Sequence, residues 1–348
     1  MKILIATTVN PFIGGGSTNI VDWLEAALQR FGHTVETFRL PFSDHHADIL
    51  EQLVALRMMD LSEYGDRLIT IRTPSHLLKH PNKVCWFIHH YRSAYDLWGT
   101  KYQAMPNTLE SEACRQAIIS ADNIGLRECK SLFCNSQVVQ NRLKTYNNLD
   151  AEVLYPPLLQ PEQFHCGEFG DYLLYFSRLT HHKRQWLAIE SLRYTKTPVH
   201  LILAGEPDPE SGGAYLRELQ ELVTRYKLSS RVTLLARWIP TEEKLRLFAE
   251  CLATLYFPFD EDSYGYPSLE SYAAGKAVIS TTDSGGTSEL LLDGVNGIIS
   301  PPDPELIAEG MDRMYRNRAA AKQMGQAGQR RIQELGIDWD NVLRRLLA

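Results

Sequence analysis

The chain has 348 residues, of which 44% are hydrophobic and 22% are charged, a composition typical of globular proteins. This length exceeds one ordinary domain, so we expect two. Asp and Glu outnumber Lys and Arg by 42 to 36, which gives a net charge of −6. That balance argues against nucleic acid as a partner, because phosphate contacts need clustered cations. No run of eighteen apolar residues occurs, so we expect at most peripheral membrane contact.

The start of the chain and its cysteines predict the compartment. The first residues, MKILIATTVNPF, form a short apolar run with no cleavage site, so no secretory signal is expected. The cysteines form no CxxC pair and lie mostly inside apolar runs, which is typical of reduced core residues. They are Cys85, Cys114, Cys129, Cys134, Cys166 and Cys251. We therefore expect a cytoplasmic protein, which includes a place at the inner face of a membrane.

The N-terminal half alternates strands with helices. Strand Lys2–Thr7 precedes a glycine loop and a helix at Thr18–Phe31, whose apolar residues share one face. Gly32 ends this helix, and we expect the segment Glu110–Asn147 to be mostly helical with a break at Gly125. Further strands are predicted at Thr34–Leu40, Leu68–Thr73, Val84–His89, Leu132–Asn135 and Glu152–Leu154.

The proline-rich segment Leu154–His165 predicts a linker, after which the alternation restarts. Strands are predicted at Tyr172–Phe176, Val199–Ala204, Val232–Leu235, Ala253–Phe257 and Ala277–Ser280, with helices at Gln185–Tyr194, Ala214–Tyr226, Glu242–Cys251 and Ser268–Ala274. After Pro304 we expect helix to the end, with Asp338 capping a last amphipathic piece, Asp338–Leu347. The alternation predicts an α/β protein with two doubly wound parallel sheets. Ligands of such folds bind beyond the carboxyl ends of strands, so the cleft between two such domains is the expected site.

The stretch Phe259–Leu290, FDEDSYGYPSLESYAAGKAVISTTDSGGTSEL, is the most informative motif. We expect a helix to begin at Pro267-Ser268 with Glu270 in its first turn. A helix N-terminus attracts phosphate, and a carboxylate beside it accepts hydrogen bonds from vicinal hydroxyls. The motif therefore suits a diphosphate flanked by sugars. Taken alone, an ordinary capped helix and a glycine turn explain it equally well.

Two cations precede this motif at the end of another strand. In SRLTHHK, Arg178 follows the strand Tyr172–Phe176 and Lys183 stands at the start of the next helix. Such a pair can neutralise the charge that develops on a leaving diphosphate without a metal. Two solvated surface cations are the alternative.

The N-terminal half has its own candidates. Gly14, Gly15 and Gly16 follow the first strand and let backbone approach a ligand closely, although G-x-G-x-x-G is not matched. His89 and His90 end a buried strand, where functional residues concentrate, although most histidines are structural. The polar and aromatic residues that follow line an acceptor site or simply cover the domain: Arg92, Tyr95, Trp98 and Tyr102.

These motifs together resemble the retaining glycosyltransferases of family 4, also called glycosyl transferases group 1. SRLTHHK, LAGE, DSYGYPSLE and SGGTSELLLDGVNGI carry the C-terminal resemblance, and FCNS before VLYPP adds to it in the N-terminal half. The resemblance implies the GT-B architecture, with two Rossmann-like doubly wound domains facing a cleft. Residues 1–157 would be the acceptor side and 158–335 the donor side, and a helix over 336–348 would cross back to the first domain.

The resemblance also implies roles for individual residues. Arg178 and Lys183 would hold the donor diphosphate, and Glu270 would bind the nucleotide ribose. Asp262, where the family usually has Glu, would contact the transferred sugar, with neighbouring Glu261 as an alternative.

Other positions match the donor turn, the glycine loop and the histidine of the family. Gly265, Tyr266 and Ser268 would present backbone N–H groups to the donor. The loop of Gly14, Gly15 and Gly16 would face the donor or else the acceptor. His89, or else His90, would lie near the transferred sugar. Glu289 either meets the donor or caps a short helix. The catalytic set implied is Asp262, His89, Arg178 and Lys183.

The function implied is a retaining, metal-independent transferase of hexose type. It would move sugar from a nucleotide diphosphate sugar to a hydroxyl of a glycan, lipid-linked or small-molecule acceptor, in polysaccharide, lipopolysaccharide or other glycan assembly. No metal and no cofactor are expected. The sequence Asp260-Glu261-Asp262 matches the D-x-D spacing of metal-dependent transferases of another fold, but the paired cations make a metal unnecessary. A sugar-nucleotide epimerase of the same fold and a non-catalytic binding subunit are the alternatives.

Overall fold

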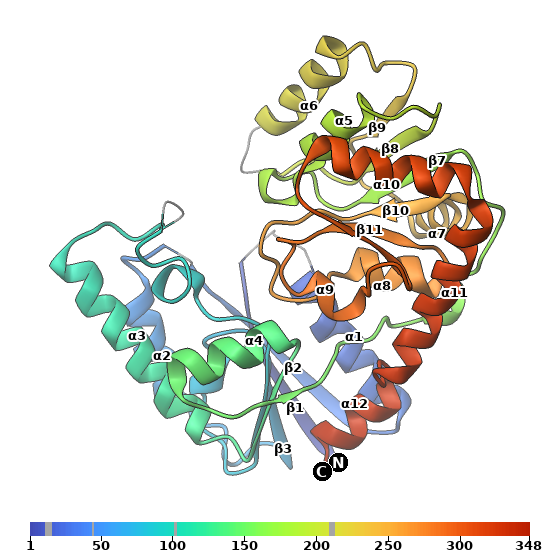
Figure 1. Cartoon of the computed structure of the whole chain (residues 1–348). Coiled ribbons are helices and arrows are strands. Elements are labelled where there is room, and N and C mark those ends of the chain that lie inside the picture. Colours follow the sequence, from blue (N-terminus) through green and yellow to red (C-terminus); the bar gives the residue numbers. More distant parts are fainter. Residues whose placement is uncertain (11–15, 44, 101–102, 209–212) are drawn as a thin grey trace. The chain divides into compact units, whose positions relative to one another are not determined.

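A computed structural model describes residues 1–10, 16–43, 45–100, 103–208 and 213–348 of the chain. They form two compact units (Figure 1). Unit 1 comprises Met1–Leu159 and Ile337–Ala348, and unit 2 comprises Gln160–Gly336. Within the described ranges, no helix is long and apolar enough to cross a membrane.

Unit 1 is built on a parallel sheet that has six strands over the described residues, in the order β2-β1-β3-β4-β5-β6. The strands are β1 (Lys2–Val9), β2 (Thr34–Pro41), β3 (Arg67–Thr70), β4 (Lys83–Phe87), β5 (Ser131–Cys134) and β6 (Glu152–Val153). Its helices are α1 (Gly16–Arg30), α2 (Ile49–Met58), α3 (Leu109–Arg127), α4 (Gln137–Arg142) and α12 (Trp339–Leu346), with short turns η1 (Ser75–Leu77), η2 (Arg92–Ala94) and η3 (Leu143–Asn147).

The last helix, α12, is part of the core of unit 1. Asp338 caps it by accepting a hydrogen bond from the Asn341 N–H at 2.7 Å, as its sequence predicts. Its apolar face packs with α1 against the sheet, where Val342 is fully buried (Figure 1). The Arg67 guanidinium donates to the Leu346 carbonyl at 2.7 Å, which holds the C-terminal end of the helix.

Two sequence predictions for unit 1 were wrong or incomplete. Gly125 does not break its helix, because α3 runs from Leu109 to Arg127 without interruption. A Cβ at this glycine would lie 2.8 Å from the His76 carbonyl oxygen, so the glycine serves close packing between segments. The helix α2 was not predicted, because its exposed positions are also largely apolar and blur the helical period.

Unit 2 has a second parallel sheet, with the strand order β12-β11-β10-β7-β8-β9 over the described residues. The strands are β7 (Tyr172–Phe176), β8 (His200–Ala204), β9 (Val232–Leu235), β10 (Ala253–Leu255), β11 (Val278–Thr281) and β12 (Gly297–Ser300). The helices are α5 (Gln185–Leu192), α6 (Ala214–Arg225), α7 (Thr241–Glu250), α8 (Tyr266–Ala273), α9 (Thr287–Leu290), α10 (Pro304–Arg316) and α11 (Arg318–Glu334), with short turns η4 (Pro161–Gln163) and η5 (His181–Lys183).

The strand order of unit 2 fixes where a ligand site can form. From the central strand β7 the chain moves outward through β8 and β9, and then returns to continue through β10, β11 and β12. The direction of the connections thus switches between β7 and β10, and folds of this class place their ligand sites at the carboxyl ends of the strands at such a point. The predicted class, two doubly wound α/β sheets, is confirmed.

Candidate functional site

Three loops of unit 2 meet at the carboxyl ends of β7, β10 and β11. The Phe259 N–H donates to the His182 carbonyl at 2.9 Å, which joins the first loop to the second. The Asp260 N–H donates to the Asp283 carbonyl at 3.0 Å, and the Gly286 N–H donates to the Glu261 carbonyl at 2.9 Å. The segments that carry the predicted cations, carboxylates and glycines therefore form one backbone cluster.

Two predicted glycines are required by this cluster. Gly285 has φ +60°, and a Cβ there would overlap the backbone of Glu261. Gly265, with φ +72°, precedes α8, and a Cβ there would overlap the ring of Tyr256. Only glycine combines a positive φ with such close approach, so these residues bring α8 and the glycine turn against the loop after β10.

Lys183 stands at the centre of the cluster, paired with an acidic residue. Its ammonium forms an ion pair with the Glu261 carboxylate and donates to the Tyr256 hydroxyl at 2.9 Å. Burial raises the pKa of Glu261, but the charge and hydrogen bond of Lys183, with smaller contributions from His182 and Tyr256, together bring that pKa below its ordinary value. The Tyr256 hydroxyl would lie 2.8 Å from a Cβ on Gly265, so the ammonium lies beside the N-terminus of α8.

Arg184, which no sequence motif had indicated, holds the loops in place. It is 8% exposed and has a left-handed backbone with φ 54°. Its guanidinium donates to the carbonyls of Phe257 and Pro258 at 2.6 and 2.9 Å, and it forms two bonds of 2.7 Å to the Asp283 carboxylate. These bonds fix the end of β10, from which the loop with Glu261 starts.

Glu270 is buried with a second lysine. The structure begins α8 at Tyr266, so Glu270 lies in the second turn and not in the first as predicted. Its carboxylate pairs with Lys244 of α7, and the ammonium lies 5.4 Å from the centre of the Phe176 ring. Burial raises the pKa of Glu270, and the charge of Lys244 lowers it by less, so the pKa is above its ordinary value.

The remaining predicted residues of unit 2 lie around this cluster. Arg178 is exposed at the end of β7, and its carbonyl accepts a hydrogen bond from Gln185 at 2.8 Å. Asp262 is half-buried on the loop after β10. The Tyr266 and Ser268 positions are the first and third residues of α8, and the Ser268 N–H already donates to the Gly265 carbonyl at 3.1 Å.

In unit 1 the two candidate histidines differ in burial. His90 is 1% exposed, its Nε2 bonds the Asn147 side-chain oxygen at 2.8 Å, and burial lowers its pKa to about 4. His89 is half-buried, and its Nδ1 lies 2.8 Å from the His90 carbonyl. Gly16 is the first residue of α1, whereas Gly14 and Gly15 lie outside the described residues.

The polar residues near His90 form a closed network. The Tyr95 hydroxyl donates to Asp122 at 2.6 Å, and the other carboxylate oxygen lies 2.9 Å from His76 Nε2. The Tyr95 ring contacts the His90 ring with a centroid distance of 4.3 Å. Of the residues predicted to line an acceptor site, Tyr95 is thus a buried structural group.

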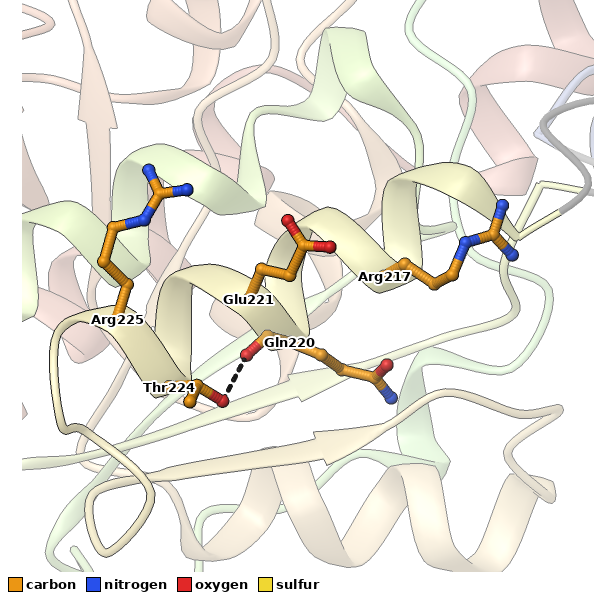
Figure 2. A pocket seen from close by; sticks show the side chains of 5 residues that line it. All are labelled: Arg217, Gln220, Glu221, Thr224 and Arg225. Atoms are coloured by element: carbon orange, nitrogen blue, oxygen red, sulfur yellow. Dashed lines mark hydrogen bonds between the residues drawn. The ribbon is translucent and has the colours of Figure 1, made fainter.

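Polar side chains of α6 border a hollow outside this cluster. A hollow of about 450 Å³ is lined by α6 alone, through the polar residues Arg217, Gln220, Glu221, Thr224 and Arg225 (Figure 2). Arg217 and Arg225 lie near opposite ends of the helix (Figure 2). Over the described ranges, no group of three or more His, Cys, Asp or Glu residues is arranged to hold a metal ion.

Residues 165–331 match the protein family described as glycosyl transferases group 1. This range, a little under half of the chain, is similar to that family. The matched range contains Lys183, Glu270 and every other predicted site residue of unit 2.

Curated relatives agree with the glycosyltransferase family. The chain is 30% identical over 234 residues to alpha-1,3/1,6-mannosyltransferase ALG2 of Homo sapiens, an alignment that spans 60% of this chain and 55% of that protein. It is 27% identical over 172 residues to sucrose synthase of Melioribacter roseus, spanning 46% of this chain and 21% of that enzyme. The chain thus matches about half of the human relative and about a fifth of the bacterial one.

Solved structures share the fold along the whole chain. HepE of Anabaena, solved in complex with UDP, has a TM-score of 0.75 and 17% identity, covering 100% of this chain and 98% of that one. Sucrose-phosphate synthase of Thermosynechococcus elongatus has a TM-score of 0.77 and 18% identity, covering 99% and 97%. WaaG, a glycosyltransferase involved in lipopolysaccharide biosynthesis, has a TM-score of 0.69 and 14% identity, covering 98% and 99%. The predicted GT-B fold is thus confirmed.

Proposed function

We propose that the protein is a glycosyltransferase that moves a hexose-type sugar from a nucleotide diphosphate sugar to a hydroxyl acceptor in glycan assembly. The observation that carries this proposal is the position of the Lys183 ammonium beside the N-terminus of α8, inside the residues that match the family. A lysine and a helix N-terminus both attract phosphate. The UDP complex of HepE supports a nucleotide donor by analogy of fold.

Each residue of the cluster has a proposed part in the reaction. Lys183 and Arg178 neutralise the charge that develops on the leaving diphosphate, and the N–H groups at the start of α8 add to this. Glu270, oriented by Lys244, accepts hydrogen bonds from the ribose hydroxyls. Asp262 contacts the hydroxyls of the moving sugar.

The proposed stereochemistry is retention. The acceptor attacks on the face that the diphosphate leaves, and a phosphate oxygen of the leaving group takes the acceptor proton. The protein then contributes orientation and electrostatic stabilisation, without a metal. His89 of unit 1, which is less buried than His90, is the proposed histidine near the transferred sugar.

The wider setting is also a proposal. Acceptors would be glycans, lipid-linked sugars or small molecules, as in polysaccharide or lipopolysaccharide assembly. The cysteines are free thiols, and Cys85, Cys114, Cys134 and Cys251 are buried, which supports a cytoplasmic place, with any membrane contact at the inner face.

Nucleotide release tests the proposal. Wild type and Lys183→Ala are incubated with UDP- and GDP-sugars and a panel of hydroxyl acceptors, with and without a chelator. We expect release with at least one donor, a loss of about 100-fold or more in Lys183→Ala, and no effect of the chelator. Lys322→Ala, an exposed lysine of α11, is the matched control and retains activity.

Three other results would contradict the proposal. Absence of release with any donor and acceptor would exclude the transferase. An isomerised donor sugar with no transfer would indicate an epimerase, and nucleotide binding without turnover would indicate a binding subunit. Inversion at the anomeric carbon, observed by NMR of the product, would exclude the retaining mechanism but not the transferase activity.

A further inference from the structure

The ammonium that the donor needs already has a counter-ion within the protein. Lys183 pairs with Glu261, and the Tyr256 hydroxyl completes a triangle, donating to the Glu261 carboxylate at 3.3 Å and accepting from the ammonium at 2.9 Å. The side chains of Lys183 and Glu261 are 14% and 25% exposed. The pair is therefore within reach of a ligand from solvent.

The backbone on both sides of this ion pair is fixed. The Lys183 carbonyl accepts a hydrogen bond from the buried Tyr175 hydroxyl. The Glu261 carbonyl accepts from Gly286 at 2.9 Å, and Gly285 packs against the same peptide. Any exchange of partners at Lys183 is thus confined to rotation of the two side chains.

A diphosphate bound to Lys183 would meet the Glu261 carboxylate, and like charges at such a distance repel. The pKa of Glu261 lies below its ordinary value under the influence of Lys183, so this carboxylate is ionised at neutral pH. A lysine without a counter-ion would in turn be costly at this depth. The Glu261 carboxylate thus stabilises Lys183 when no diphosphate is bound and opposes the binding of a diphosphate.

We propose that Glu261 is a resident counter-ion that competes with the diphosphate for Lys183. The inference rests on the proposed function and gives Glu261 a role distinct from contact with sugar. Binding of the donor displaces the carboxylate from the ammonium, and its return weakens the hold on the nucleoside diphosphate product. Glu261 is a positioning residue for Lys183.

The first test measures binding of UDP, GDP and inorganic pyrophosphate by calorimetry to wild type and Glu261→Gln. The amide keeps the size of the side chain and removes its charge. We expect Glu261→Gln to bind at least one nucleoside diphosphate about tenfold more tightly, equivalent to about 1.4 kcal/mol, and pyrophosphate more tightly as well. Glu221→Gln on α6, which removes the same charge from an exposed position (Figure 2), is the control and leaves the Kd unchanged.

The second test needs no ligand. The rate at which a small acylating reagent modifies Lys183 is measured by peptide mass spectrometry in both proteins. We expect faster modification of Lys183 in Glu261→Gln, because the ion pair covers the amine. Glu261→Ala replaces Glu261→Gln in both tests if the amide variant unfolds at a lower temperature than wild type.

The outcomes separate this inference from the proposed function. Unchanged or weaker binding of all three probes by Glu261→Gln would overturn the inference, even if the enzyme transfers sugar. Tighter binding of pyrophosphate alone, with no nucleoside diphosphate bound by either protein, would support the counter-ion and refute the nucleotide-sugar function. An unchanged modification rate of Lys183 would contradict the ion pair itself.

Discussion

The two lysine–glutamate pairs of unit 2 have the same chemistry and different surroundings. In the pair of Lys183 with Glu261 the carboxylate side chain is 25% exposed, and in the pair of Lys244 with Glu270 it is 5% exposed. The lysine lowers the pKa of Glu261 below its ordinary value, whereas burial raises the pKa of Glu270 above it despite its own lysine. Lys183 is itself more buried than Lys244, with 14% against 24% of the side chain exposed, so the exposure of the carboxylate is what distinguishes the two pairs.

The first prediction extends this comparison to the most buried cation of the site, Arg184. Replacement by Met removes its bonds to Asp283 and to the carbonyls of Phe257 and Pro258. We expect a loss of about 3–4 kcal/mol in the free energy of unfolding, because two carbonyls and a partly exposed carboxylate lose their partner. Urea unfolding checks this. A loss no larger than that of Lys322→Met would contradict the role of Arg184 as a structural residue.

The second prediction uses side-chain burial to separate the roles of the two histidines of unit 1. His90→Ala should lower the free energy of unfolding by about 3 kcal/mol, because it leaves a cavity and removes the bond to the Asn147 side-chain oxygen. His89→Ala should leave stability nearly unchanged and reduce nucleotide release. Unfolding curves and release assays of both variants check this. If His90→Ala is as stable as wild type but less active, His90 is the functional histidine and His89 is not.

The third prediction separates the two lysine–glutamate pairs directly. Lys244→Met should cost about 2 kcal/mol of stability, since it leaves the buried Glu270 without a partner, although the partial exposure of Lys244 moderates the effect. Lys183→Met should cost about 1 kcal/mol or less. Lys244→Met should also raise the KM for the donor with a smaller change in kcat, whereas Lys183→Met should lower kcat. Equal stability losses would mean that burial does not distinguish the pairs.

The fourth and smallest effect concerns pH. The raised pKa of Glu270 means that its ionised form destabilises the folded state at neutral pH, and that this cost is relieved as pH falls through the raised pKa toward the ordinary value of 4.5. The lowered pKa of Glu261 has the opposite sign. Ionised Glu261 stabilises the folded state at pH values above 4.5, and this stabilisation is lost only as the pH falls through the lowered pKa.

Unfolding midpoints at pH 7, 6 and 5 measure this difference. Wild type should gain stability relative to Glu270→Gln as the pH falls over this range. The difference between wild type and Glu261→Gln should stay constant. If the stability of both variants relative to wild type changes with pH in the same way, the two glutamates do not have opposite effects on stability.

The local pattern of the sequence was sufficient for most elements but not for the contacts between them. Apolar periodicity predicted α1, the strands of unit 1 and β7 to β11 of unit 2, but not β12, because side-chain alternation depends only on neighbours. It failed at α2 and at Gly125, where exposed apolar residues and close packing against His76 override the local pattern. Glu270 was found through its motif, but its place in the second turn depended on the start of α8 at Tyr266.

The partners of the charged residues were beyond sequence reasoning. Lys183 and Glu261 are 78 residues apart, and Arg184 and Asp283 are 99 residues apart. Lys244 has the surroundings of an ordinary surface lysine in TEEKLRLF, and nothing in that segment indicates Glu270. Such pairs form only when the strand order brings the ends of β7, β10 and β11 together.

The sequence by itself determined the alternation of strands and helices, the phosphate-attracting start of α8, and the identity of Lys183 and Glu270 as candidates. These follow from local periodicity and from motifs whose glycines permit close approach. Only the tertiary structure decided that Glu261 neutralises Lys183, that Lys244 accompanies Glu270, and that Arg184 fixes the loops. Burial and long-range pairing set these relations, because the cost of an unpaired charge appears only when the folded chain removes it from water.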